Sequence, residues 1–198
     1  MDAEERELVT DLRRGNAAAF RRAYAAYRPR VYGFLLRLSG RRDVADDLLQ
    51  ETFIKLARNA ASLREDTRLV AWLLTVARNE FLSYRRWSVL DITRILSFGR
   101  EQSDAVDEGP EARTQAQARL QLLERGLSEL PTASREVLLL VGVEGLDQEE
   151  AAEILGLGYA ALRQRLSRAR AELAQRIEAL EKRRAKLEPK RASERGAT

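Results

Sequence analysis

The chain contains no cysteine and no histidine among its 198 residues. This excludes zinc sites built from thiolates and imidazoles, thiol nucleophiles, disulfide bonds and imidazole bases. An enzyme would be left with carboxylate-bound metals, or with serine, lysine or tyrosine chemistry. This composition weakens most enzyme hypotheses. We expect a protein that is not an enzyme and that requires no cofactor.

Long apolar segments are also lacking. The longest uncharged runs, residues 69–77 and 154–162, have nine residues each, and a membrane-spanning helix needs ~20. The first residues are acidic, whereas a secretory signal starts with a basic segment followed by an apolar one. The sequence therefore predicts a cytoplasmic protein with no membrane insertion.

Helix breakers are few, with four prolines and eleven glycines in the chain. Between them, apolar residues recur at spacings of three and four, which is typical of helices, and no segment shows a convincing strand pattern. We therefore predict an all-α fold, in which Pro29 breaks or kinks the second helix. The expected helices span residues 3–14, 17–38, 43–59, 69–87, 115–130, 131–144, 148–155 and about 159–184.

One segment is too polar to belong to a packed core. Residues 99–114 contain five acidic and two basic residues and one aliphatic residue suited to burial. We therefore predict two small helical domains, residues 1–92 and 115–182, joined by a flexible acidic linker at 93–114. Residues 183–198 would form a basic tail, because 182–198 carry seven basic against two acidic residues. Such an end is typical of a frayed, solvated helix, and a role in nucleic-acid binding is the alternative.

Residues 148–170 have the pattern of a helix-turn-helix. This motif needs a small residue where its helices meet, a glycine in the turn and apolar residues that fix the crossing angle. Ala152 and Gly156 fill the first two roles, and Ala151, Leu155, Leu157 and Leu162 fill the third. An ordinary helical hairpin is the alternative. DNA binding is favoured because the second helix carries four arginines and no acidic residue from 159 to 171.

A helical wheel divides this second helix into two faces. At about 100° per residue, a buried stripe forms from Leu162, Leu166, Ala169 and Leu173. The opposite face, toward solvent or DNA, presents Ala160, Gln164, Ser167 and Arg168. Glutamine and arginine can form paired hydrogen bonds with adenine and guanine edges, respectively. Arg163 and Arg165 flank this face and would suit phosphates.

The N-terminal half contains two further patterns. One is the helix at 43–59, whose acidic and amide side chains (Asp43, Asp46, Asp47, Gln50 and Glu51) fall off its apolar face. A solvated helix with a favourable dipole explains them equally well; magnesium binding has no supporting second group of carboxylates. On the other helix, 69–87, one strip carries aromatic, amide and guanidinium groups that suit single-stranded nucleic acid. The strip consists of Trp72, Thr75, Asn79, Ser83 and Arg86. Burial of Trp72 in the core is the alternative.

In this order and spacing, the segments resemble bacterial RNA polymerase sigma factors, in particular the short extracytoplasmic-function (ECF) subfamily. The likeness covers residues 5–180 and rests on segments 15–32, 46–53, 71–86, 130–136 and 149–170. It implies a sigma factor that binds core RNA polymerase and directs promoter-specific transcription initiation. The domain at 1–92 would bind the polymerase clamp and the minus 10 element, and the helix-turn-helix domain at 115–182 the minus 35 element.

The resemblance also assigns individual residues. It implies that Asp47, Gln50 and Glu51 contact the polymerase. It implies minus 10 contacts for Asn79, Tyr84, Arg85 and Arg86, and it places the loop 62–68 near a flipped base. Minus 35 contacts fall to Arg163, Gln164, Ser167 and Arg168, beside the flanking Arg165. The sequence departs from the family pattern at Glu80, Ser83 and Gly158, and over the segment 160–165.

Core RNA polymerase and promoter DNA are the expected partners, and an anti-sigma factor is a further candidate. The main alternative is a free-standing helix-turn-helix transcriptional regulator with a helical dimerisation domain. A helical adaptor that binds only protein would leave the arginine-rich face of residues 159–171 without a function.

Overall fold

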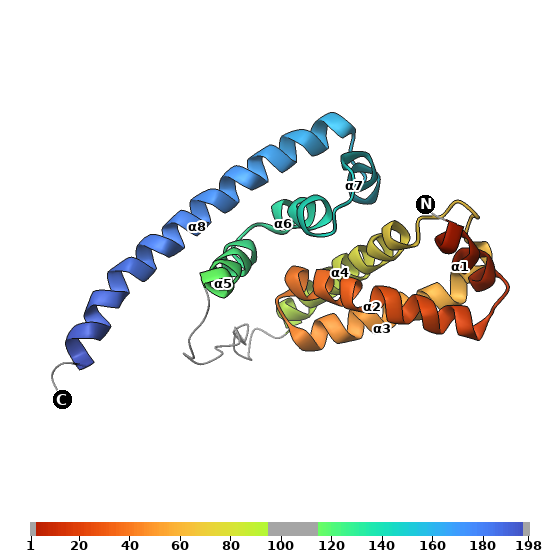
Figure 1. The fold of residues 1–198 in the computed structure, drawn as a ribbon, viewed down its shortest axis with the longest axis horizontal. Coiled ribbons are helices and arrows are strands. Elements are labelled where there is room, and N and C mark those ends of the chain that lie inside the picture. Colours follow the sequence, from red (N-terminus) through yellow and green to blue (C-terminus); the bar gives the residue numbers. More distant parts are fainter. Residues whose placement is uncertain (1–2, 95–114, 196–198) are drawn as a thin grey trace. The chain divides into compact units, whose positions relative to one another are not determined.

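The computed structural model describes residues 3–94 and 115–195, and side chains over 3–88 and 117–183. Every regular element in these ranges is helical, which confirms the predicted all-α fold (Figure 1). The chain divides into two compact units, Met1–Ala105 and Val106–Thr198. Most of the predicted linker, residues 95–114, lies outside the described residues, so its flexibility stays a prediction.

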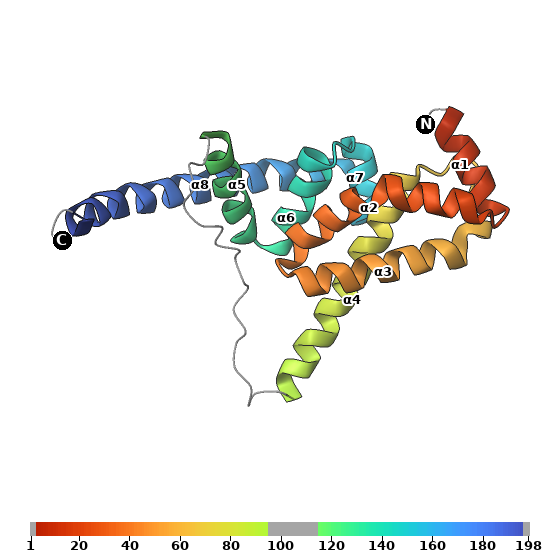
Figure 2. The same ribbon diagram turned by 60° about the horizontal axis from the view of Figure 1, so that its bottom comes forward.

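The first unit contains four α-helices. They are α1 (Ala3–Arg13), α2 (Ala17–Ser39), α3 (Arg42–Asn59) and α4 (Leu69–Arg94), with a 3₁₀ turn, η1 (Ala60–Ser62), after α3. Helices α2, α3 and α4 pack against one another, and α1 lies against α2 and η1 (Figures 1 and 2). Their shared core is aliphatic and aromatic, with Phe34, Leu35, Leu56, Leu73 and Leu74 among its buried members. Helix α4 is longer than predicted, because it continues past residue 87.

A short polar turn sets the start of α2. Gly15 adopts a left-handed conformation with φ of 74°. The side-chain oxygen of Asn16 then accepts the backbone N–H groups of Ala18 at 2.8 Å and Ala19 at 3.3 Å. This N-cap satisfies two donors that the helix itself leaves unpaired.

The sequence predicts a break or a kink at Pro29. The break is wrong, because α2 runs without interruption from Ala17 to Ser39, and the kink stays a prediction. Proline removes one backbone hydrogen bond from a helix interior. Pro29 lies on the exposed side, while Val31, Phe34 and Leu35 are fully buried on the other side. Burial of that apolar face holds the helix together across the missing hydrogen bond.

The second unit consists of α5 (Gln115–Ser128), α6 (Thr132–Leu138), a π-helical turn η2 (Leu139–Val143), α7 (Gln148–Leu155) and α8 (Tyr159–Arg195). Helix α8 packs against α5, α6 and α7 in turn, as Figure 1 shows. The approach of α5 is close at Gly126, where an added Cβ would lie 3.1 Å from Leu173 Cδ1. Helix α8 extends beyond the predicted end near 184, and residues 184–198 lie outside the described side chains.

Arg135 fixes the junction between α5 and α6. Its Nη2 donates to the carbonyl oxygens of Ser128 at 2.5 Å and Leu130 at 3.0 Å. One carbonyl belongs to the last residue of α5 and the other lies two residues beyond it, where no helical donor remains for them. Ser134 Oγ donates to Glu172 Oε2 at 2.7 Å and links α6 to α8. Among the described residues, no helix is long and apolar enough to cross a membrane.

Candidate functional site

The helix-turn-helix predicted in the second unit is present. Asp147 caps α7 through Oδ1, which accepts the Glu150 N–H at 2.8 Å. At the other end, Gly156 adopts φ of 65°, and its N–H donates to carbonyls of the last turn. The Leu157 N–H donates to Ala152 O at 2.9 Å and completes the C-cap. A side chain at position 156 would strain this turn, because glycine alone adopts such a φ without cost.

The first turns of α8 expose the side chains that the helical wheel places outward. Leu162, Leu166 and Ala169 are buried, and Leu173 is half-buried. The exposed side chains include most of the predicted minus 35 contacts, namely Arg163, Gln164, Ser167 and Arg168, whereas Arg165 is half-buried. The faces are as predicted, and contact with DNA stays a prediction.

One arginine of α8 is held by an aromatic ring. The guanidinium carbon of Arg163 lies 5.9 Å from the centroid of the Tyr159 ring, within the range of a cation–π interaction. The Tyr159 ring is itself 48% exposed. Sequence reasoning missed this pair, although its spacing of four residues on a helix was visible.

Helix α3 separates its apolar and acidic side chains. Val44, Leu48, Leu49, Thr52, Phe53 and Leu56 are buried, whereas Asp46, Asp47, Gln50 and Glu51 are exposed. Asp43 is different, because its hydrogen bond with the Arg41 guanidinium lowers its pKa. Within the described part of the chain, the other three carboxylates of α3 form no ion pair, and no three carboxylates converge on a site for a metal.

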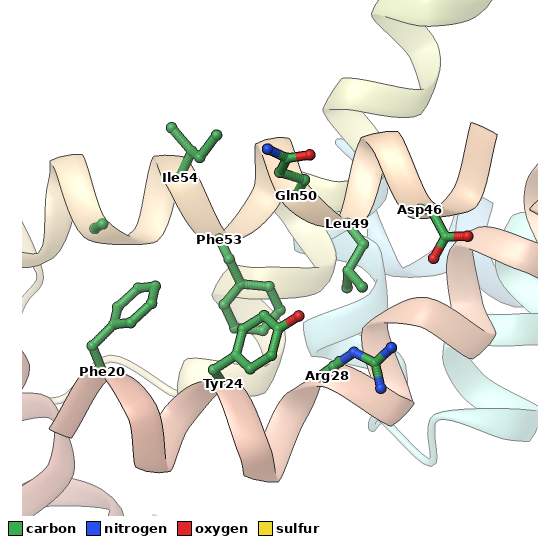
Figure 3. A pocket seen from close by; sticks show the side chains of 9 residues that line it. Phe20, Tyr24, Arg28, Asp46, Leu49, Gln50, Phe53 and Ile54 are labelled. Carbon is green, nitrogen blue, oxygen red and sulfur yellow. The ribbon is translucent and has the colours of Figure 1, made fainter. Parts of the chain in front are cut away.

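A groove of about 390 Å³ lies between α2 and α3 beside these carboxylates (Figure 3). The rings of Tyr24 and Phe53 meet edge to face in it, with centroids 4.7 Å apart. Phe20 approaches Phe53 at 6.4 Å, and Asp46 and Gln50 also contribute to the lining. Sequence reasoning gave the groove no role. The available signal was the pair of aromatic residues four apart at positions 20 and 24.

The strip predicted on α4 divides into two parts. Trp72, Thr75 and Ser83 are half-buried, and Thr75 donates to the Ala71 carbonyl at 2.8 Å. The exposed residues include the four predicted minus 10 contacts, Asn79, Tyr84, Arg85 and Arg86. The Arg85 guanidinium carbon lies 5.9 Å from the centroid of the Phe81 ring. Arg86 Nη2 donates to Ser83 Oγ at 3.2 Å.

Glu80, which departs from the family pattern, has a partner on the neighbouring helix. Its Oε1 accepts a hydrogen bond from Lys55 Nζ at 2.5 Å. Only 16% of the Glu80 side chain is exposed, so the carboxylate needs the counter-charge. The ion pair links α3 to α4 and offsets a negative charge close to the predicted minus 10 surface.

Charged side chains of the loop between η1 and α4 form ion pairs within the loop and with α1. Arg64 donates to both carboxylate oxygens of Asp66, at 2.9 and 2.8 Å, and this lowers the pKa of Asp66. Arg13 Nη1 donates to Glu65 Oε1 at 2.6 Å and ties the loop to α1. The predicted position of this loop near a flipped base stays a prediction.

Comparisons with known proteins match both units. Sigma-70 region 2 matches residues 23–87, and Sigma-70, region 4 matches residues 120–173. The ECF RNA polymerase sigma factor EcfG of Rhodopseudomonas palustris is 35% identical over 153 residues, which cover 73% of this chain and 77% of EcfG.

Two solved structures are similar as well. The sigma factor RpoE of Bartonella quintana, solved with the anti-sigma factor NepR, is 30% identical with a TM-score of 0.69. The match covers 80% of this chain and 96% of RpoE. CnrH of Cupriavidus metallidurans, solved with the cytosolic domain of CnrY, is 26% identical with a TM-score of 0.64. That match covers 88% of this chain and 97% of CnrH.

The chain belongs to the ECF family of RNA polymerase sigma factors. Sigma factors bind core RNA polymerase and direct it to promoters, so the chain acts in transcription initiation. The free-standing regulator is accordingly not favoured.

Proposed function

We propose that the first unit binds core polymerase and the minus 10 element, while α8 reads the minus 35 element. The chain would have no catalytic activity of its own and would act in the cytoplasm, with polymerase and promoter DNA. One observation carries the proposal. The same chain has an acidic surface beside an aromatic groove in one unit and an arginine-rich helix-turn-helix in the other.

The polymerase contact is proposed for Asp47, Gln50 and Glu51 of α3. Their exposure and the absence of ion pairs for both carboxylates among the described residues support it. An unpaired surface carboxylate is well hydrated, so a cationic partner can approach without first breaking an internal salt bridge. The groove lined by Tyr24 and Phe53 could accept an apolar side chain of that same partner.

The minus 35 contact is proposed for the exposed face of α8. Ala160 and Ser167 are small and exposed, so the helix can approach base edges in a major groove. Gln164 and Arg168 would read bases, and Arg163 and Arg165 would contact phosphates. The half-burial of Arg165 suits a side chain that positions the helix.

The minus 10 contact is proposed for Asn79, Tyr84, Arg85 and Arg86 on α4. Amide, aromatic and guanidinium groups together suit a melted strand, because bases stack on rings and the backbone attracts cations. An anti-sigma factor is a further proposed partner, because the related RpoE and CnrH were solved with NepR and with the cytosolic domain of CnrY.

Transcription reconstituted from purified components tests this proposal. The chain should co-elute with core polymerase and produce run-off transcripts that core alone does not. Footprinting on promoters with varied spacing between the two elements should show sharp selectivity only with core polymerase. Core would fix the positions of both units, whereas a flexible linker adds only a modest effective concentration. Strong spacing selectivity by the free chain would instead support the free-standing regulator.

A further inference from the structure

Glu80 places a negative charge on a helix segment that is otherwise basic. Between positions 69 and 88, α4 carries three arginines and no second acidic residue. Glu80 follows Asn79 directly and precedes Tyr84 by one helical turn, so it lies beside two of the proposed minus 10 contacts. A carboxylate at this place would repel a nucleic-acid strand, because every nucleotide carries a negatively charged phosphate.

The counter-charge for Glu80 comes from the neighbouring helix. Helices α3 and α4 pack against each other, and Lys55 Nζ on α3 donates to Glu80 Oε1 at 2.5 Å. The Lys55 side chain is 45% exposed, whereas that of Glu80 is 16% exposed. Lys55 is also the only lysine before position 182, and its ammonium is a compact charge that suits a single carboxylate oxygen.

Loss of this lysine would change the electrostatics beside the proposed strand. A carboxylate that is mostly buried is poorly solvated without a partner, and its full charge would then act on nearby phosphates. For two like charges about 8 Å apart, Coulomb repulsion corresponds to a loss of affinity of roughly 2- to 30-fold, from the dielectric constant of water to that of a protein surface.

We propose that Lys55 is a positioning residue for minus 10 recognition, which acts by holding the Glu80 carboxylate paired and away from the melted strand. The inference rests on the proposed function of α4 and adds a residue of α3 that itself touches no DNA. A tie that only fastens α3 to α4 is the competing explanation of the ion pair. The two roles differ when the negative charge itself is removed.

The test uses holoenzyme assembled from the full chain and core polymerase, titrated onto a labelled, pre-opened minus 10 bubble that lacks a minus 35 element. Lys55→Ala should weaken binding by roughly 2- to 30-fold, because Glu80 then stays unpaired. Glu80→Gln should bind as well as wild type or better. The double variant Lys55→Ala/Glu80→Gln should recover most of the affinity, because no carboxylate remains to repel the strand.

Two further variants serve as controls. Lys55→Arg keeps the cation and should stay near wild type. Lys182→Ala removes a lysine whose Nζ lies equally close, at 2.5 Å, to Glu178 Oε1 in the other unit. It should not change binding to the bubble, because that DNA offers the second unit no minus 35 element. Thermal unfolding of each variant fixes a temperature at which all of them are folded.

A scan of uncharged phosphates separates repulsion from a change in structure. Single methylphosphonates, which lack the negative charge, are placed one at a time along the melted strand. At the phosphate nearest Glu80, the difference between wild type and Lys55→Ala should shrink, because one of the two repelling charges is gone. The same difference should also shrink at higher salt, which screens exposed charges.

Three results would overturn the proposal. The first is a loss of affinity in Glu80→Gln as large as that in Lys55→Ala, which is the result expected of a tie between helices and needs no folded Lys55→Ala protein. The second is a Lys55→Ala loss that no methylphosphonate position reduces. The third is a loss fully explained by weaker core binding, measured separately. Failure of the proposed function is distinguishable, because wild-type protein would then bind neither core nor the bubble.

Discussion

The two helices predicted to contact DNA, α4 and α8, share one local arrangement. In each, an arginine lies over an aromatic ring four residues earlier, Arg85 over Phe81 and Arg163 over Tyr159, and both distances are 5.9 Å. The rings differ in burial, since Phe81 is 3% exposed and Tyr159 is 48% exposed. In α4 the arginine is therefore anchored to the core, whereas in α8 both partners belong to the outer surface.

The rest of each surface differs in a way that fits two states of DNA. Helix α8 exposes small residues and arginines with no acidic residue from 159 to 171, which suits a paired major groove. Helix α4 exposes the aromatic residues Tyr84 and Trp87, which suit unstacked bases. Under the proposed assignments, rings on α4 and small side chains on α8 would determine which form of DNA each helix binds, while arginines would serve both.

The largest expected effect concerns the acidic surface of α3, a proposed polymerase contact that only the first unit has. Replacing Asp47 and Glu51 together by alanine should weaken core polymerase binding by about 2–5 kcal/mol if their charges are desolvated in the complex. The DNA affinity of the free chain should not change, because the acidic surface of α3 takes no part in it. Quantitative pull-down or fluorescence anisotropy with labelled core would measure the loss.

Asp43→Ala is the matched control for that double variant. It removes a carboxylate from the same helix, but one that is already paired with Arg41, so core binding should stay near that of wild type. Equal losses in both proteins would mean that α3 contributes only general negative charge. Unchanged binding of the double variant, with intact circular dichroism, would refute the polymerase assignment.

The next effect sharpens the division within α8 between base contacts and phosphate contacts. Arg168→Ala should relax preference at one upstream base pair by about 1–3 kcal/mol. Arg165→Ala should weaken all promoters evenly and reduce the salt dependence by about one phosphate contact. Binding of both variants to a library of minus 35 sequences, at two salt concentrations, would separate them. If both variants lost affinity in the same pattern across the library, Arg165 and Arg168 would make the same kind of DNA contact.

The sequence predicted which side chains are buried wherever apolar residues recur with the helical period. The buried stripe of α8 followed from residues at spacings of three and four, and the exposure of Gln164 and Arg168 followed with it. The acidic face of α3 was predictable for the same reason. Gly156 could be placed in the turn because few residues other than glycine suit a left-handed C-cap.

Other features depend on packing between segments, which one-dimensional patterns do not encode. The continuity of α2 through Pro29 depends on the apolar face that it buries against α3 and α4. The Lys55–Glu80 ion pair joins residues 25 positions apart. Trp72 and Trp87 lie on one helix, but only the structure shows that the first is half-buried and the second largely exposed. Burial at such positions depends on where the neighbouring helices end.

The smallest effect tests whether the ring in α8 acts through its arginine. Exposed cation–π pairs contribute about 0.5–1 kcal/mol, so Tyr159→Ala should lower holoenzyme affinity for minus 35 duplex by roughly 2- to 5-fold. Tyr159→Phe should be nearly neutral, because the ring face remains. The corresponding change in α4, Phe81→Ala, would instead open a core cavity at about 3–5 kcal/mol and confuse folding with binding.

A double-mutant cycle decides between an indirect and a direct role for Tyr159. If the ring only orients Arg163, then Tyr159→Ala should cost nothing in an Arg163→Ala background, and the coupling energy should equal the whole single-variant effect. Anisotropy titrations of the four holoenzymes on one labelled duplex, at fixed salt, give that energy. A Tyr159→Ala cost that persists without Arg163 would mean that the exposed ring contacts DNA itself. Helix α8 would then contact DNA through an aromatic residue, as α4 is proposed to do. The two surfaces would differ only in the small residues that α8 exposes at 160 and 167.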